Sequence, residues 1–448
     1  MTLFKFTHDW VAAGDDEPEI LHTMTNLALH IDNINLMQNE DIWAKTIRES
    51  VLVSAYPLAM WLASSWWRLN FEILPPHVRE QSPLIDWRMA HEMGAANHGF
   101  VWPTVIFASD GEVMKVWAKP SNGNIQQSVR YLNGLTQPIS IQLAEFQKCV
   151  DDFIASVLSR LDAVGCPNTD LRHLWLAVEE ERADPLNFNY RRLEAQLGYE
   201  PDECSEAMMS KAQALEQQMG AEALAELAPL YGKIIGDTSL NALEEMINSL
   251  GLTATPNIPS LQKSKSTKAA PWQHAVAVAR ELWASLSKQG DVIENQQLYD
   301  LLGLSASAVE QWTPPNAYKP AAIAVPCNAN QLKIVPRKKH PMAKRFELAR
   351  LLSDYIFTND IDKKWLASTD LATSRQQYQR AFAAEFLCPI NALQDFLKND
   401  YSESAIEDAS EHFQVSQATV NSLLINNGFL PPFIGDYAEI RLPYPLGT

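Results

Sequence analysis

The sequence predicts a multidomain α+β protein in which helices predominate. Three observations support this: 448 residues suffice for about three domains, the 46% hydrophobic content suffices for large cores, and helical periodicity fills most of the chain between short β-rich runs. We expect four regions: a tryptophan-rich α+β module at 1–135, an α-helical block at 136–250, a linker at 251–272, and a last domain at 273–448.

The charge balance and the cysteine content limit the compartment and the partners. The 36 Lys and Arg residues against 54 Asp and Glu residues give a formal net charge of −18, which disfavours non-specific attraction to nucleic acid or anionic membranes. The five cysteines show no C-x-x-C spacing, which fits a reduced compartment. The sequence lacks both an apolar run of membrane-spanning length and a leader-like N-terminus. We therefore expect a cytoplasmic protein with no membrane partner.

The first region is predicted to fold around its tryptophans, since eight of the thirteen lie in the first 120 residues. The run 101–118 places β-rich residues on both sides of an Asp-Gly turn at 109–111, which predicts a strand hairpin. Trp66, Trp67 and Arg68 could form an aromatic interface. Core packing is the favoured use for most of these tryptophans.

The middle of the chain is predicted to be helical. Apolar residues recur every three or four positions from 142 to 165, as on an amphipathic helix. Asn168 or Thr169 can cap the next helix, which runs to Arg182. Further helices are expected at 188–198, 203–218, 221–231 and 239–250. The linker at 251–272 is instead poor in large apolar residues and rich in Pro, Ser, Thr and Lys.

The last region mixes helices with two strands. A helix is expected at 274–288, followed by two short helices within 291–312 that turn at Gly303. Short strands follow at 321–325 and 332–335. The later helices are expected from Met342 onward, at 374–387, and as a pair at 403–427.

Two segments of this region carry a family resemblance. The run K-R-F-E-L-A-R-L-L-S-D-Y-I at 344–356 resembles the active-site helix of the ImmA/IrrE-type zinc metallopeptidases, usually R-F-T-L-A-H-E-L-G-H-L-L. The run F-A-A-E-F-L-C-P at 382–389 resembles the helix that brings the family's third metal ligand, and V-S-Q-A-T-V at 415–420 resembles a later helical stretch. The resemblance covers about residues 270–430 and implies a metallopeptidase-like (zincin-like) domain.

The residues that the family's chemistry needs are missing from these positions. Such sites use two histidines four apart as zinc ligands, the intervening glutamate as a base, and a third acidic ligand. Arg350, Leu351 and Asp354 align with His, Glu and His, and Tyr378 aligns with the third ligand. Arg350 stays protonated and Leu351 is no base, so the resemblance implies a degenerate metal site, with no catalytic residue, metal or other cofactor expected. Arg350 and Asp354 are expected to form an i, i+4 ion pair worth a few tenths of a kcal/mol.

A second histidine motif lies in the first region, where His91-Glu92 is followed by His98. The spacing departs from HExxH because the position four after His91 is Ala95. A structural role is favoured, and a metal or catalytic role for His91, Glu92 and His98 stays open without a third ligand.

The helical pair at 403–430 has the spacing of a helix-turn-helix. It contains four carboxylates and neither Lys nor Arg, so a structural pair is favoured over a DNA reader.

The one basic run, at 333–350, offers a local contact for nucleic acid or an acidic partner, although a solvated loop is favoured. The residues of that contact would be Arg337, Lys338, Lys339, Lys344 and Arg345, with Lys263, Lys265 and Lys268 of the linker beside them.

These patterns predict a non-catalytic regulatory or scaffold protein that binds a protein partner through a pseudo-metallopeptidase domain. The resemblance implies a setting such as phage defence, a toxin-antitoxin pair or regulation of a mobile element. Two alternatives stay open: an active zinc metallopeptidase with non-standard ligands, and a DNA-binding transcriptional regulator. The sequence leaves the oligomeric state and the role of residues 1–250 open.

Overall fold

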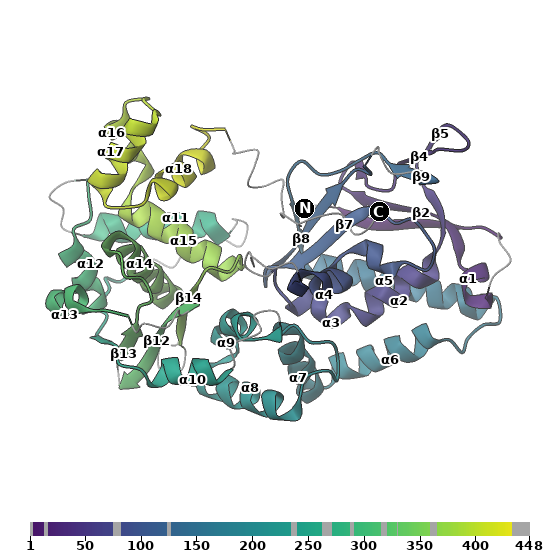
Figure 1. Ribbon diagram of the computed structural model, residues 1–448, viewed down its shortest axis with the longest axis horizontal. Helices are drawn as coiled ribbons and strands as arrows, with labels where there is room; N and C mark the ends of the chain where they lie inside the picture. The colour runs from purple at the N-terminus through teal and green to yellow at the C-terminus, as the bar shows by residue number, and fades with distance from the viewer. Residues whose placement is uncertain are drawn as a thin grey trace. The chain divides into compact units, whose positions relative to one another are not determined.

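A computed structural model of the chain shows two compact units, each described here by itself (Figure 1). It describes residues 3–12, 17–74, 82–122, 127–233, 240–261, 271–286, 291–314, 320–328, 330–358 and 365–431. The N-terminal unit holds the described residues up to Ser210 with Gly232 and Lys233, and the C-terminal unit holds the others. The mixture of helices and antiparallel strands confirms the α+β class. No helix among the described residues is both long enough and apolar enough to cross a membrane.

The N-terminal unit contains three small antiparallel sheets. In the first, β2 (Met24–Ile31) pairs with β1 (Phe4–Trp10), β3 (Ile34–Asn35) and β6 (Val51–Ser54). In the second, β8 (Val113–Lys119) lies between β7 (Thr104–Ser109) and β10 (Ile139–Gln142). In the third, β4 (Asn39–Asp41) lies between β5 (Thr46–Arg48) and β9 (Val129–Tyr131).

Helices cover these sheets, and α2 (Ala55–Ser64), α3 (Trp66–Phe71) and α5 (Leu143–Ala163) lie together on one side of them (Figure 1). The long helix α5 packs against β1, β8 and β10 through buried apolar residues that recur every three or four positions, as expected. Thr169 caps α6 by accepting a hydrogen bond from the Arg172 N–H, also as expected. The helices are α1 (Pro18–His22), α2 (Ala55–Ser64), α3 (Trp66–Phe71), α4 (Ser82–His91), η1 (Met93–Ala96), α5 (Leu143–Ala163), α6 (Asp170–Ala183) and α7 (Pro185–Gln196).

The predicted hairpin is present as β7 and β8, and Asp110 forms its turn by accepting hydrogen bonds from the N–H groups of Glu112 and Val113. The aromatic-interface hypothesis is wrong, because Trp66, Trp67 and Arg68 are all buried. Trp67 stacks on Phe71 and donates to the Glu181 carboxylate, so it joins α3 to α6. Trp43, by contrast, is exposed.

The C-terminal unit is built around one four-stranded antiparallel sheet of order β11-β13-β12-β14. Its strands are β11 (Leu252–Ala254), β12 (Ala321–Asn328), β13 (Gln331–Val335) and β14 (Leu366–Thr369). Its helices are α9 (Ala221–Leu227), η2 (Ala228–Leu230), α10 (Leu240–Asn248), α11 (Pro271–Ser285), α12 (Asn295–Leu302), α13 (Ala306–Gln311), α14 (Pro341–Phe357), α15 (Ser374–Leu387), α16 (Ile390–Leu397), α17 (Glu403–Phe413) and α18 (Gln417–Asn426). The unit boundary falls within α8 (Glu206–Met219).

The centre of this unit is the packing of α15 against both α11 and α14. Phe382 and Phe386 of α15 are fully buried and stack on each other. Gly303 ends α12 in the left-handed conformation, with φ of 62°, and so makes the expected turn before α13. The helical pair is also present, since α17 and α18 pack on each other through a buried core that includes Phe413 and Val420.

The domain boundaries differ from the four expected regions. The expected helical block at 136–250 begins with a strand, β10, and is divided between the two units. The linker prediction is wrong at Leu252–Ala254, because these residues pair with β13 as an edge strand of the sheet. Leu252 and Ala254 alternate inward with Thr253 outward, a pattern too short to recognise among Pro, Ser and Thr. Residues 262–270, with Lys263, Lys265 and Lys268, lie outside the described residues.

Candidate functional site

The positions that match the metallopeptidase motif lie on α14 and α15, which pack side by side after the strands β12 and β13. Leu351 is fully buried in the apolar core of the unit. Tyr378 is buried as well, with its ring 4.7 Å from that of Phe357 and 5.8 Å from that of His274. Burial raises the pKa of Tyr378. Both side chains therefore pack the core, and neither is placed for acid-base chemistry at neutral pH.

Asp354 is buried and held by a two-pronged ion pair. Its Oδ1 accepts from Arg375 Nε and its Oδ2 from Arg375 Nη2, both at 2.8 Å, while Oδ2 also accepts from the Ala367 N–H at 3.1 Å. Burial alone would lower the pKa of Arg375, but the Asp354 carboxylate raises it above its ordinary value. Because both carboxylate oxygens are engaged, Asp354 has no oxygen left without a partner to offer a metal ion.

Arg350 points to a different partner. Its Nη2 donates to the carbonyl oxygen of Thr369, at 2.6 Å, and to Oε1 of Gln376. The expected ion pair between Arg350 and Asp354 is therefore wrong, because β14 and α15 supply each side chain with a closer partner. Arg350 is only 5% exposed, and among the described residues its Nε has no hydrogen-bond acceptor. Burial lowers the pKa of Arg350 to about 9, and the nearby Arg380 and Arg337 contribute to that decrease.

Neutral amides occupy the stretch where the family would bring its third ligand. Gln376 Oε1 accepts from the Thr369 N–H at 2.9 Å, and its Nε2 donates to the carbonyl of Ala367 at 3.0 Å. Gln379 donates to the same Ala367 carbonyl at 2.9 Å. These contacts join α15 to β14. Arg375, Gln376 and Gln379 are thus the residues that sequence reasoning missed, and their only signal was a polar run without a carboxylate.

Three of the five basic residues expected to form a contact surface turn inward. Arg337 donates to the carboxylates of Glu347 and Asp370. Lys344 donates to the backbone carbonyls of Val309 and Trp312, and Arg345 to the carbonyl of Ile293 and the side chain of Asn295. Only Lys338 and Lys339 of the five reach the surface, Lys338 with 41% of its side chain exposed. The expected electropositive face is therefore wrong for Arg337, Lys344 and Arg345, because their side chains are buried and donate to acceptors of the same unit.

A cavity of about 340 Å³ opens beside Arg350, where α14 meets the start of α18. Eight polar or charged residues line it together with three apolar residues of the first turns of α14. The lining residues are Lys338, His340, Met342, Ala343, Phe346, Glu347, Arg350, Asp370, Arg380, Ser416 and Thr419. We call this cavity the Arg350 pocket. Residues from the start of α18 thus line the same pocket as Arg350 of α14.

In the N-terminal unit, His91 of the histidine motif has a structural role. His91 is fully buried, stacks on Trp87, and has Nδ1 at 2.8 Å from the Phe107 carbonyl and Nε2 at 3.0 Å from a carboxylate oxygen of Glu72. His98 is exposed, in a turn with φ of 57°. No group of three His, Cys, Asp or Glu side chains able to hold a metal ion occurs in the described part of the chain.

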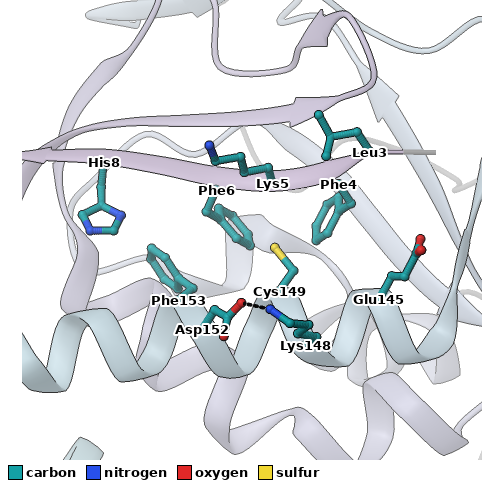
Figure 2. Close-up of a pocket in the computed structure, with 10 residues that line it drawn as sticks. All are labelled: Leu3, Phe4, Lys5, Phe6, His8, Glu145, Lys148, Cys149, Asp152 and Phe153. Atoms are coloured by element: carbon teal, nitrogen blue, oxygen red, sulfur yellow. Dashed lines mark hydrogen bonds and ion pairs between the residues drawn. The ribbon is translucent and has the colours of Figure 1, made fainter. Parts of the chain in front are cut away.

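A second cavity, of about 580 Å³, lies in the N-terminal unit between β1 and α5 (Figure 2). Phe4, Phe6 and Phe153 form its apolar wall, and Lys148 pairs with Asp152 at 2.6 Å at its side. Cys149 faces this cavity, but burial raises the pKa of its thiol to about 11. The thiol therefore stays protonated at neutral pH, which disfavours a nucleophilic role.

No known family, curated protein or solved structure matches this chain.

Proposed function

We propose that the chain is a non-catalytic binding protein whose C-terminal unit uses a degenerate metallopeptidase-like scaffold to recognise a protein partner. The order of elements supports the scaffold: two strands, the helix α14, a strand and the helix α15 follow one another in the region of the motif resemblance. The observation that carries the proposal is the buried pair of Asp354 with Arg375. This pair engages both oxygens of Asp354, the carboxylate of α14 that aligns with a ligand position of the motif.

The alternative of an active peptidase with non-standard ligands has little chemical support at this position. A catalytic zinc site needs three protein ligands and an open position for water. Arg350 carries no lone pair for a metal, Leu351 offers no base, and Gln376 is engaged through both its oxygen and its nitrogen. Converting this site to a zinc site would require breaking a buried ion pair and two amide contacts.

The alternative of a DNA reader is disfavoured by the charge of the helical pair. A recognition helix needs Lys or Arg to neutralise phosphates, and α17 and α18 contain neither. The basic residues just before α14 and on its first turns lie largely inside the unit, as described above. A protein partner is the better match to a surface with few basic side chains.

The test is the zinc stoichiometry of the full chain after incubation with zinc and dialysis, measured by elemental analysis. We expect well below one zinc per chain, and the same value for Asp354→Asn. One zinc per chain that falls in Asp354→Asn would overturn the proposal. To test partner binding, a photo-crosslinking residue at position 339, exposed beside α14, should capture a protein in the native host more efficiently than one at exposed Lys398. Equal capture at both positions would refute binding at this face.

A further inference from the structure

We propose that the Arg350 pocket binds a phosphate monoester, with Arg350, Arg380 and Lys338 as the cationic groups and the start of α18 as the hydrogen-bonding edge. The proposal rests on the proposed function in one respect, since it takes the degenerate metal site to be a binding site. It adds the chemical class of the ligand. The source of the monoester is either a small phosphorylated molecule or a phosphorylated side chain of the protein partner, and the experiment below separates them.

The pocket carries an excess of positive charge within a protein of net charge −18. Lys338, Arg350 and Arg380 line it together with two carboxylates, Glu347 and Asp370. Arg337 lies behind them and already engages both carboxylates, through Nε to Glu347 at 2.8 Å and through both terminal nitrogens to Asp370. Four cationic groups therefore share two anionic ones, and an entering dianion would balance the remainder.

Arg350 and Arg380, the two arginines that line the pocket, have no carboxylate as a hydrogen-bond partner among the described residues. Arg380 donates from Nη2 to the Leu371 carbonyl at 2.7 Å, and both hydrogen bonds of Arg350 to described residues also leave from Nη2. A buried cation that is paired only with neutral acceptors is costly, because its desolvation is not repaid by an opposite charge. The unpartnered Nε of Arg350 is the kind of buried polar atom that an ion or ligand group explains.

The start of α18 adds donors on the opposite edge of the pocket. Ser416 is the N-cap of this ten-residue helix, and its hydroxyl oxygen lies 2.9 Å from that of Thr419. Whichever hydroxyl donates to the other, one hydroxyl proton is left to donate elsewhere. The first turn of α18 contains no acidic residue, so the positive end of the helix dipole faces the pocket without a carboxylate of its own helix.

The electrostatic state of the arginines agrees with an anion site. Burial lowers the pKa of both Arg350 and Arg380, and repulsion from Arg337 lowers both further. A bound anion would reverse that repulsion. The clustering is therefore unfavourable in the empty pocket and favourable in the occupied one, as expected of residues kept for binding rather than for stability.

The shape of the pocket favours a monoester over a free inorganic ion or a polymer. Met342, Ala343 and Phe346 form an apolar wall beside the cationic groups, so the ligand has an apolar body attached to its anionic group. A volume of about 340 Å³ accommodates a phosphate and one attached unit of the size of an amino-acid side chain or a sugar. Arginine forks match phosphate oxygens in geometry, and a monoester carries close to two negative charges at neutral pH.

The experiment measures the affinity of the full chain for four probes by isothermal titration calorimetry: inorganic phosphate, adenosine monophosphate, phosphotyrosine and unphosphorylated tyrosine. We expect saturable binding of at least one monoester with a Kd below about 1 mM, and none of tyrosine. Tighter binding of phosphotyrosine indicates a phosphorylated side chain as the source, and tighter binding of adenosine monophosphate indicates a small molecule. Binding of inorganic phosphate alone, or of no probe, would overturn the proposal.

Two variants and a matched control locate the site. Arg350→Gln should weaken monoester binding by about tenfold or more, since it removes a charge-assisted contact, and Lys338→Ala by about threefold. Lys339→Ala is the control, because Lys339 is the exposed neighbour that does not line the pocket, and its affinity should equal that of the unmodified chain. Lys338 is partly exposed, so its variant tests the site even if Arg350→Gln fails to fold. Equal affinities in Lys338→Ala and Lys339→Ala would refute the assignment, whereas zinc uptake would refute only the proposed function.

Discussion

Substituting Asp354 by Ala should destabilise the C-terminal unit strongly. The change removes both carboxylate oxygens that hold Arg375 and the acceptor of the Ala367 N–H. Asp354 is 1% exposed, and the side chain of Arg375 retains only 15% of its accessible surface. The guanidinium would remain largely buried without its partner, so the cost is that of an uncompensated charge rather than that of a surface ion pair.

The magnitude follows from this burial. Removing one member of a buried ion pair costs about 3–5 kcal/mol, and leaving a buried backbone donor such as the Ala367 N–H unsatisfied costs about 1–3 kcal/mol. Part of that loss is recovered, because Glu226 lies close enough to Arg375 to raise its pKa and can attract the freed guanidinium. We therefore expect Asp354→Ala to lower the free energy of unfolding by about 3–4 kcal/mol.

The assay is urea unfolding followed by circular dichroism, together with hydrogen exchange of the peptide that contains β14. A double-mutant cycle with Arg375→Leu should show coupling of at least about 2 kcal/mol, since the second change removes the stranded charge. Asp408→Ala is the control, an exposed Asp on α17 of the same unit, with an expected effect within about 0.5 kcal/mol. A loss below about 1 kcal/mol in Asp354→Ala, or unchanged exchange at Ala367, would refute the structural role of this pair.

Three further predictions concern other positions in the chain. Burial raises the pKa of Glu226 above its ordinary 4.5, so the folded chain holds this proton more tightly than the unfolded chain and loses stability as the pH rises above that value. Glu226→Gln should therefore stabilise the chain at neutral pH, and thermal unfolding should show that this gain in stability shrinks as the pH falls toward 4.5. A gain that does not change with pH would contradict this prediction. Gly303→Ala should lower the free energy of unfolding in urea by at least about 2 kcal/mol, since the φ of Gly303 is 62° and the new Cβ would overlap the Thr255 carbonyl. A decrease below about 0.5 kcal/mol would contradict this conformation of the turn. Iodoacetamide should modify the exposed Cys327 first and leave Cys388 unmodified until the chain unfolds, as measured by peptide mass spectrometry. The reason is that Cys388 is fully buried and its burial raises the pKa of its thiol. Early labelling of Cys388 would contradict this packing.

The fold could be predicted best where the chain repeats an amphipathic period over several turns. The helix α5 lies close to its expected range because it buries a face that recurs every three or four residues. The helices α14 and α15 also begin near their expected positions, although they are buried over most of their circumference. The strands β3, β4 and β5 could not be predicted, since they have only two or three residues and no alternation can be detected over that length. Their pairing depends on partners far along the chain, such as Tyr131 opposite Asn39.

The candidate site could be located from the sequence, but its contacts could not be predicted. Spacing on one helix places Arg350 and Asp354 on one face, and on an isolated helix they would pair. In the folded unit the competing partners come from β14 and from Arg375 on the next helix, 21 residues beyond Asp354. The same limit applies to Lys344 and Arg345, whose acceptors include backbone carbonyls that no residue type reveals.

The pairing pattern on α14 decides which kind of ion this site can attract. A zinc site places neutral histidines and carboxylates around a dication, so its empty form is neutral or negative. Here the two carboxylates of the motif, Glu347 and Asp354, are paired with Arg337 and Arg375, while Arg350 has only neutral acceptors among the described residues. A cation entering beside Arg350 would add to an unbalanced positive charge, and an anion would remove it. If the proposed metallopeptidase-like scaffold holds, an arginine at the first ligand position does more than delete a ligand, because it reverses the sign of the ion that the site favours.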